Sequence, residues 1–448
     1  IWNLGDNPLY RVCPMDQLMP LQPDLMINIS ASPFDYDHEE DRRAVVRENV
    51  LKYRLPMYYC NAVGSQTEIV FDGGSVVYDA EANLTHRLKV FEEDFCIADT
   101  EIKYPPFAEA TEGRAHPVEG STAEAPINPP STTEVRQPST VNRQPSPTQP
   151  HPPSTINHER VIPYLIRPDN IKEIHDALIL GIRDYFGKMG FVKAILGSSG
   201  GIDSALTLAL ACEALGKENV RAVAMPSGFS TTHSVEDAVQ LSKNLGNPFD
   251  IIPIQPIYES FLSSLKPVFK DLPFSVAEEN IQSRSRGNLL MAIANKFGYI
   301  LLNTSNKSEL ATGYGTLYGD MAGGLSVPGD VYKTQVYALA RYMNRDKEII
   351  PVNILDKAPS AELRPDQKDS DSLPEYEILD KILYLYIEKR QGPKEIIGMG
   401  VDESLVRRVL KLVNSNEYKR NQFCPIIRVS CKAFGVGRRM PIVGRYLG

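Results

Sequence analysis

Eight consecutive residues carry the strongest chemical signal in the sequence: Gly197-Ser198-Ser199-Gly200-Gly201-Ile202-Asp203-Ser204. Two adjacent glycines let the backbone approach an anion closely and adopt dihedral angles closed to other residues. A helix that begins directly after them points its unpaired amides and positive dipole end at the same place. The serine hydroxyls add donors, and Asp203 adds a carboxylate able to hold Mg²⁺ against phosphate oxygens. The segment therefore predicts a phosphate-binding loop.

The plainer alternative is an ordinary strand-to-helix turn, in which Ser and Asp only cap the helix. Two glycines flanked by serine, directly after an apolar run, favour the phosphate loop over that alternative. The sequence has neither the GxxxxGK[ST] nor the GxGxxG pattern at this place, so the loop belongs to another type.

A parallel sheet must position this loop. Apolar, β-branched runs at 191–196, 220–225, 249–254 and 299–305 predict strands, and helical patterns separate them, among them 203–215 and 278–296. Strands that alternate with helices of this length predict a doubly wound α/β sheet, with ligands at the carboxyl ends of the strands. Thr304 ends the fourth strand, where a ligand is expected.

The bulk properties favour a reduced, water-soluble protein. The 448 residues carry a net charge of -8, which argues against a general nucleic-acid binder. Six scattered cysteines without CxxC pairs indicate free thiols, and no apolar run reaches the roughly 18 residues that a membrane span needs. We expect a cytoplasmic protein without a signal peptide. Because the chain starts at Ile1, we also expect a fragment.

Composition divides the chain into three segments. Residues 105–160 are rich in Pro, Ser and Thr and predict a linker without a core. Residues 1–104 contain predicted strands at 24–30, 57–63 and 68–79 and one amphipathic helix at 39–54, which indicates part of an α/β sandwich. Residues 161–448 hold the doubly wound sheet.

The loop resembles the SGGxDS pyrophosphate loop of the ATP pyrophosphatases, which split ATP into AMP and pyrophosphate. That group includes the NAD, GMP, asparagine and argininosuccinate synthetases. The segments 277–327, 331–342, 360–383 and 416–442 resemble the corresponding regions of NAD synthetases. The chain is thus similar to the glutamine-dependent NAD(+) synthetase family. This resemblance implies amidation of deamido-NAD to NAD with ATP and Mg²⁺, through an adenylated intermediate.

The resemblance also implies roles for single residues. Asp203, Lys333 and Glu309 would be catalytic, and Asp203 and Glu309 would hold the metal. The whole loop 197–204 and Thr304 would bind ATP. The residues implied for deamido-NAD are Asn280, Arg284, Arg286, Glu309, Lys419 and Arg420. Without the resemblance, the charged residues of that set would be interpreted as solvated surface positions.

The N-terminal residues resemble the second half of a nitrilase-like glutaminase domain, on the segments 1–8, 25–34 and 58–75. In that family a Glu-Lys-Cys triad hydrolyses glutamine, and all three positions would precede Ile1. Ser32 and His38 match glutamine-contacting positions, whereas Cys13 and Cys60 do not match the nucleophile. We therefore expect free ammonia as the nitrogen source of this chain.

Two other functions stay open on the sequence alone: another pyrophosphate-loop amide ligase such as GMP synthetase, and an inactive assembly subunit. Dependence of AMP release on deamido-NAD separates the first from the leading hypothesis. The intact loop argues against the second. Two departures from the family pattern, Ser198 and Ser370, bear on details of binding. The resemblance further implies pairing of synthetase domains, small-molecule substrates, and neither nucleic acid nor membrane as partner.

Overall fold

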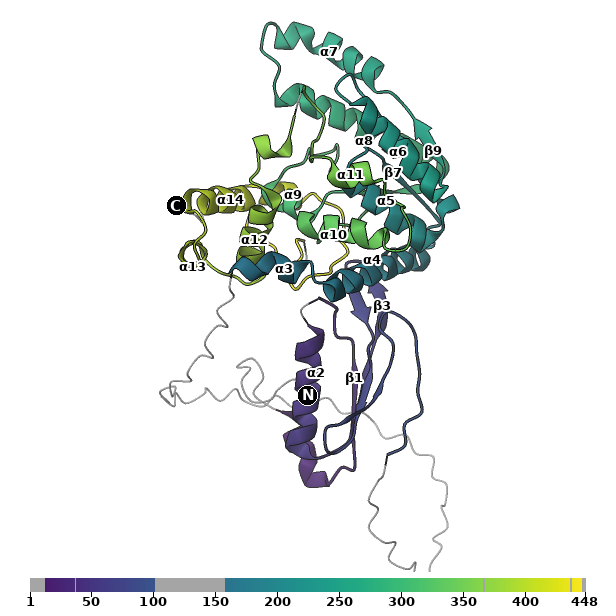
Figure 1. Ribbon diagram of the computed structural model, residues 1–448, viewed down its shortest axis with the longest axis vertical. Coiled ribbons are helices and arrows are strands. Elements are labelled where there is room, and N and C mark those ends of the chain that lie inside the picture. The colour runs from purple at the N-terminus through teal and green to yellow at the C-terminus, as the bar shows by residue number, and fades with distance from the viewer. Residues whose placement is uncertain (1–12, 37, 101–157, 366, 436, 445–448) are drawn as a thin grey trace, which may run out of the picture. The chain divides into compact units, whose positions relative to one another are not determined.

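The computed structural model describes residues 13–36, 38–100, 158–365, 367–435 and 437–444 (Figure 1). The predicted linker at 105–160 lies outside these residues, except for its last three, which form the 3-10 helix His158–Arg160. The described residues on either side of it belong to one unit. The two sheets of this unit are described in turn, beginning with the N-terminal one.

The N-terminal region is a small sheet covered on one face by a helix. Its four-stranded sheet has the order β1-β2-β5-β6, with a parallel first pair and antiparallel pairs after it. A separate hairpin pairs β3 with β4. The bounds are α1 Pro14–Leu18, β1 Met26–Ser30, α2 Glu39–Tyr53, β2 Met57–Asn61, β3 Val63–Gln66, β4 Ile69–Asp72, β5 Val76–Tyr78 and β6 Leu84–Arg87.

Alternating side chains form the core of this region, because successive residues of a strand point to opposite faces. Met26, Met57 and Tyr59 of the sheet pack against Val46 and Val50 of α2. The predicted single strand at 68–79 is two strands in the structure. Gly73 and Gly74 separate them with φ of +68° and +61°, a left-handed conformation that an extended strand cannot contain.

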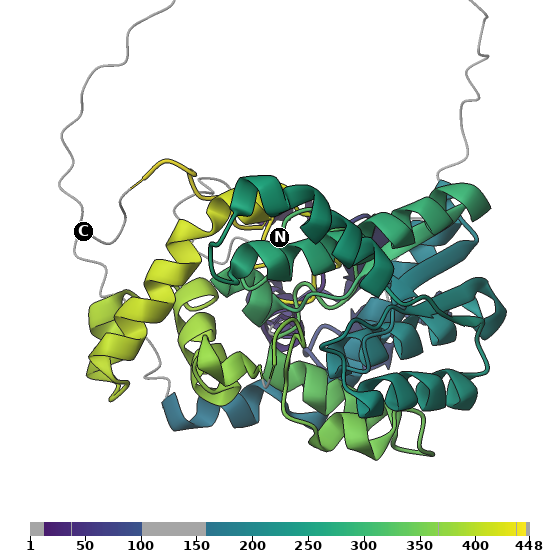
Figure 2. The ribbon, with the colours of Figure 1, turned by 90° about the horizontal axis from the view of Figure 1, so that it is seen from above.

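The C-terminal region contains a five-stranded, wholly parallel sheet with the order β11-β10-β7-β8-β9. Its strands are β7 Lys193–Gly197, β8 Val220–Ala224, β9 Phe249–Ile251, β10 Tyr299–Asn303 and β11 Leu325–Ser326. The four predicted strands are present, and the two-residue β11 is an addition. Helices lie on both sides of the sheet (Figure 2). The predicted doubly wound α/β fold is confirmed.

The helices of this region connect and cover the strands. α5 and α6 follow β7 and β8, and α8 packs against β7 and β10. The bounds are α3 Val161–Leu165, α4 Pro168–Met189, α5 Ile202–Leu215, α6 Thr232–Leu245, α7 Gln255–Phe269, α8 Val276–Phe297, α9 Lys307–Thr312, α10 Lys333–Met343, α11 Val352–Asp356, α12 Tyr376–Ile387, α13 Pro393–Gly398, α14 Glu403–Ser415 and α15 Glu417–Arg420.

Local sequence signals set the helix ends that matter for the site. α5 begins directly after Gly201 and stops at Gly216, whose φ is +85°. α8 begins with a capping box between Ser275 and Glu278, in which side chain and backbone satisfy each other's donors. The strand order reverses between β7 and β10, so this pair flanks the topological switch point, where open α/β sheets bind ligands.

Candidate active site

A cavity of about 290 Å³ opens at the carboxyl ends of β7, β8 and β10. A volume at the lower end of the range for small-molecule pockets fits part of a nucleotide-sized ligand. Most of the residues implicated by the sequence line its wall. They are Gly197, Ser198, Ser199, Gly200, Gly201, Ile202, Asp203, Ser204, Arg286, Thr304, Glu309 and Lys333.

The loop between β7 and α5 depends on one of its two glycines. Gly200 has a φ of +77°, and a Cβ there would lie 2.1 Å from the backbone oxygen of Ser234. Gly201 has an ordinary φ of -97°, and a Cβ there would meet Ser199 Oγ at 3.3 Å. The expectation that both glycines adopt dihedral angles closed to other residues is therefore correct for Gly200 alone.

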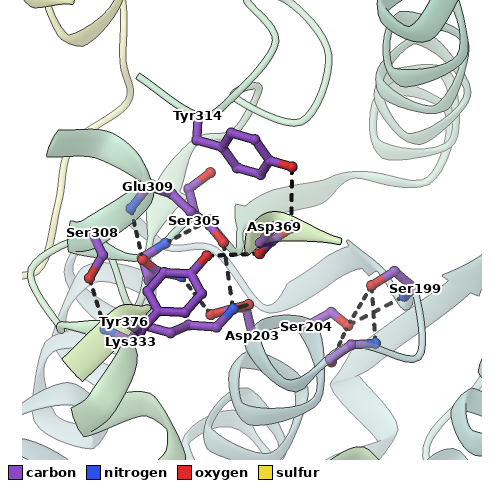
Figure 3. Close-up of polar contacts among 12 residues, drawn as sticks. Ser199, Asp203, Ser204, Ser305, Ser308, Glu309, Tyr314, Lys333, Asp369 and Tyr376 are labelled. Carbon is purple, nitrogen blue, oxygen red and sulfur yellow. Dashed lines mark hydrogen bonds and ion pairs between the residues drawn. The ribbon is translucent and has the colours of Figure 1, made fainter. Parts of the chain in front are cut away.

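The loop serines bond to their own loop in this structure (Figure 3). Ser204 Oγ donates to the Gly201 carbonyl at 2.9 Å, and the amides of Ser199 and Gly201 donate to serine hydroxyls at 3.3 Å. These bonds fix the turn of the loop at the amino end of α5, where helices commonly bind anions. Ser198 is buried and lines the cavity, and its hydroxyl has no hydrogen-bond partner among the described residues.

An ion cluster forms the floor of the cavity beside the loop (Figure 3). Lys333 Nζ lies 2.5 Å from Asp203 Oδ2 and 3.6 Å from Glu309 Oε1. The other oxygen of Asp203 accepts a hydrogen bond from Asn306 Nδ2 at 2.9 Å. Asn306 also caps α9, the helix that carries Glu309. Helices α5, α9 and α10 thus bring together the three residues that the family resemblance implied as catalytic, Asp203, Glu309 and Lys333.

Burial makes the charges of this cluster unequal. Burial raises the pKa of Glu309, and the nearby negative charge of Asp203 raises it further, against the opposing effect of Lys333. Burial alone would lower the pKa of Lys333, but the charges of Asp203 and Glu309 outweigh it and raise the pKa. Lys333 therefore stays a cation. A further positive charge nearby would stabilise the ionised forms of the two carboxylates that face it.

Asp369 is a third carboxylate of the cavity, and sequence reasoning missed it. Its two oxygens accept hydrogen bonds from Tyr376 at 2.8 Å and Tyr314 at 3.2 Å. The ring of Tyr376 also lies under Lys333 Nζ, 5.2 Å from the ring centroid. Asp369 stands next to Ser370, which is exposed. The acidic run at 369–371 was the available signal.

Asp320 is a fourth carboxylate that the sequence did not single out. It lines the cavity wall, although the residue as a whole is exposed. Desolvation of its carboxyl group raises its pKa, and hydrogen bonds from the Thr316 amide at 2.6 Å and the Ser283 hydroxyl at 2.9 Å act in the opposite direction. The sequence signal for Asp320 was its position in the Gly-rich segment between β10 and β11. Ser283 belongs to α8, one turn from Arg286.

Arg286 is the one predicted dinucleotide-binding arginine that lines the cavity. Its Nε donates to the Met225 carbonyl at 3.0 Å, and burial lowers its pKa to about 10. It remains a cation at neutral pH and leaves its terminal nitrogens for an anion.

Four predicted dinucleotide contacts do not line this cavity. Asn280 accepts from Thr316, Arg284 donates to the Leu317 carbonyl, and Lys419 donates to the carbonyls of Gly313 and Gly315. Arg420 is buried, and its guanidinium bonds Glu417 and the carbonyls of Leu310, Ala311 and Val413. In this structure Arg420 holds the carboxyl end of α9, and Lys419 fixes the loop that follows α9.

The two predicted glutamine-contacting residues, Ser32 and His38, lie in the N-terminal region. They do not line the cavity described above. Ser32 is buried, and its amide donates to Asn61 Oδ1 at 2.8 Å. His38 is the residue before α2. Cys60 is exposed on β2, and Cys13 lies 3.1 Å from the Tyr53 hydroxyl.

The described residues contain no group of three or more His, Cys, Asp or Glu side chains that could hold a metal ion by themselves. Asp203 and Glu309 nevertheless fit Mg²⁺, because both offer hard oxygen donors beside a phosphate loop. Mg²⁺ usually binds through one or two carboxylates and completes its shell with water and substrate phosphates.

Comparisons with known proteins relate this chain to one family. The model of the NAD synthase family matches residues 174–423. The glutamine-dependent NAD(+) synthetase of Synechocystis is 41% identical over 445 residues, which is 99% of this chain and 71% of the relative. That of Thermotoga maritima is 44% identical over 424 residues, or 94% of this chain and 70% of the relative. The chain belongs to the NAD synthase family.

Solved structures of the family share the fold. The glutamine-dependent NAD+ synthetase from Acinetobacter baumannii, in complex with ADP, is 35% identical, with a TM-score of 0.60 over 96% of this chain and 69% of that one. The enzyme from Cytophaga hutchinsonii is 17% identical with a TM-score of 0.69 and supports the fold alone. The N-terminal and C-terminal regions therefore occur together in relatives of this family.

Proposed function

We propose that this chain is a carbon–nitrogen ligase that converts deamido-NAD to NAD, with ATP, Mg²⁺ and ammonia as the other reactants. The observation that carries the proposal is the Asp203–Lys333–Glu309 cluster at the foot of the β7–α5 loop, in a chain of the NAD synthase family. ADP in the A. baumannii relative supports a nucleotide at the same fold.

In the first step the nicotinate carboxylate attacks the α-phosphorus of ATP, and pyrophosphate leaves. The β7–α5 loop, which lines the cavity, and the amino end of α5 would receive the phosphates, and Lys333 would balance the charge that grows on the leaving group. Mg²⁺ held by Asp203 and Glu309 would neutralise charge on the phosphate oxygens.

In the second step ammonia attacks the carbonyl carbon of the mixed anhydride, AMP leaves, and the nitrogen loses a proton. No covalent bond to the protein is required, so positioning and charge neutralisation supply the catalysis. Arg286 is placed to hold an anionic part of deamido-NAD at the cavity wall, and Asp320 and Asp369 line the same wall.

The test is a product analysis with ATP, Mg²⁺, deamido-NAD and ammonium chloride. We expect AMP, pyrophosphate and NAD in equal amounts, and no AMP without deamido-NAD. ADP as the product, or AMP release that does not depend on deamido-NAD, would refute the proposal. A GMP synthetase-like ligase would instead respond to xanthosine monophosphate, so that nucleotide is the matched control.

Two further properties concern membranes and self-association. No helix in the described ranges is long and apolar enough to cross a membrane. Pairing of the synthetase domains stays a prediction, which light scattering of the purified chain can check.

A further inference from the structure

A buried lysine lies next to the cavity but does not line it. Lys307 is the first residue of α9 and is completely inaccessible to solvent. Its Nζ lies 2.7 Å from Glu388 Oε1, 2.9 Å from Asp330 Oδ1 and 2.7 Å from the Ser430 hydroxyl. The second oxygen of Glu388 accepts a hydrogen bond from the Tyr36 hydroxyl at 2.9 Å. We call these five residues the Lys307 cluster.

The Lys307 cluster holds one cation and two carboxylates at positions closed to water. The side chains of Lys307, Asp330 and Glu388 are each 0% exposed. Amides of Val429 and Ser430 donate to Asp330 at 2.8 and 2.7 Å, which supplies the second carboxylate with further donors. Buried ion pairs add little net stability compared with apolar packing, so their value is in fixing one arrangement.

The arrangement that the cluster fixes is the first turn of α9. This helix has six residues, too few to hold its conformation alone. The residue before Lys307 is Asn306, which bonds Asp203 and caps the helix, and two residues after it comes Glu309. A shift of Lys307 would therefore move Glu309, and it would move the Asn306 amide that bonds Asp203.

Tyr36 connects this arrangement to the N-terminal region. It follows β1, and its amide donates to the Val429 carbonyl at 3.2 Å while its hydroxyl reaches Glu388. From this hydroxyl a hydrogen-bonded path runs through Glu388 and Lys307 to α9. The N-terminal region and the cavity are thus joined by side chains that are all buried.

We propose that the Lys307 cluster is a positioning device through which Tyr36 of the N-terminal region holds Glu309 and Asp203 in the geometry that binds the magnesium nucleotide. The inference rests on the proposed function for its ligand. Tyr36, Glu388 and Lys307 are positioning residues, because none of them lines the cavity.

The experiment uses the full chain and three variants. Tyr36→Phe removes the bond to Glu388 and keeps the ring. Lys307→Met removes the central cation. Asp184→Asn is the matched control, because Asp184 of α4 accepts from the Ser65 amide at 2.5 Å and so joins the same two regions at a place away from α9. Two quantities are measured for each: the melting temperature, and the Mg²⁺ concentration that half-saturates binding of a non-hydrolysable ATP analogue.

We expect Tyr36→Phe to raise the half-saturating Mg²⁺ concentration about threefold to tenfold, and Lys307→Met to raise it more. Asp184→Asn should lower the melting temperature about as much as Tyr36→Phe without changing the Mg²⁺ dependence. The double variant Tyr36→Phe/Lys307→Met should match Lys307→Met alone, because residues on one path are not additive.

Two results would overturn the inference. One is a Tyr36→Phe variant that melts earlier but keeps the Mg²⁺ dependence of the unaltered chain. The other is additive behaviour in the double variant, which would mean that Tyr36 and Lys307 act separately. The analogue-binding measurement does not need turnover. A failure of the proposed reaction would therefore appear in the product analysis, while the positioning role would still be decided by Mg²⁺ binding.

Discussion

The cavity floor and the N-terminal sheet each contain a buried ion pair, and the two pairs are completed differently. In the N-terminal region Arg42 and Asp72 form a two-bond pair at 2.7 and 2.5 Å, with side chains 4% and 5% exposed. Asn61 donates to the same carboxylate and accepts from the Ser32 amide. Every partner comes from the protein, so this pair is structural.

At the cavity floor the partners are fewer than the charges. Asp203 and Glu309 share Lys333, Asp369 accepts hydrogen bonds from two tyrosine hydroxyls, and burial raises the pKa of Glu309. A site that leaves negative charge in excess is completed by a cationic ligand such as Mg²⁺ with its nucleotide. The comparison suggests that a buried carboxylate without enough protein partners marks the functional site, and a fully paired one marks the core.

The largest effect should come from breaking the fully paired site. Asp72→Ala leaves the Arg42 guanidinium buried without its counter-ion, which costs about 3–5 kcal/mol of stability. The melting temperature should fall strongly, while turnover per folded molecule changes far less. Asp79→Ala is the control, since Asp79 is a partly exposed acid of the same region. Equal melting temperatures for both variants would contradict the structural role of Asp72.

The next effect concerns the incomplete site. Asp203→Asn keeps the shape of the side chain but removes a charge beside the phosphate loop. We expect kcat for NAD formation to fall on the order of a hundredfold, with little change in melting temperature. Asp250→Asn is the control, because it alters an acid of β9 that is paired with Arg221 of β8. An Asp203→Asn variant with normal turnover would mean that another carboxylate does this work.

A smaller effect on activity should distinguish the two loop glycines, Gly200 and Gly201. Gly200→Ala forces a side chain into a left-handed conformation and against the Ser234 carbonyl, so kcat/KM for ATP should fall about tenfold to a hundredfold. Gly201→Ala needs only a small movement of the Ser199 hydroxyl, so its loss should be milder. Steady-state kinetics of both variants decide the point, and equal losses would show that Gly201 also needs its freedom.

The smallest effect depends on pH and lies away from the cavity. His175 is buried between Asp176 at 2.9 Å and Glu213 at 3.2 Å. Burial lowers its pKa, but these two hydrogen bonds outweigh it and raise the pKa overall. The stability contributed by the protonated ring is therefore complete below about pH 6.5 and lost as pH rises through the raised folded-state pKa.

We expect His175→Gln to lower the melting temperature by about 2–4 °C at pH 6, and by less at pH 9. Differential scanning fluorimetry at both pH values measures the difference. An equal loss at both would assign the effect of His175 to packing and not to charge.

Local sequence patterns predicted the elements better than the contacts between them. The parallel strands and the phosphate loop follow from apolar runs and glycine placement, which act over a few residues. Asp369 and Asp320 were missed because their places in the cavity wall depend on hydrogen bonds from Tyr314 and Ser283, which are 55 and 37 positions away in the chain. Arg420 shows the reverse case: the family resemblance implied a ligand contact, but in this structure the carbonyls at the end of α9 accept hydrogen bonds from its guanidinium. Propensity does not report such long-range partners.

Asp203, the carboxylate that follows the phosphate loop, contacts residues that lie far along the chain. Its partners Asn306 and Lys333 are 103 and 130 positions away. Contacts between distant segments must close large loops and form slowly, whereas helices form from near neighbours. During refolding from denaturant, helical circular dichroism should therefore recover before ATP binding does. The large sequence separation between Asp203 and its two partners thus predicts that the site forms after the helices.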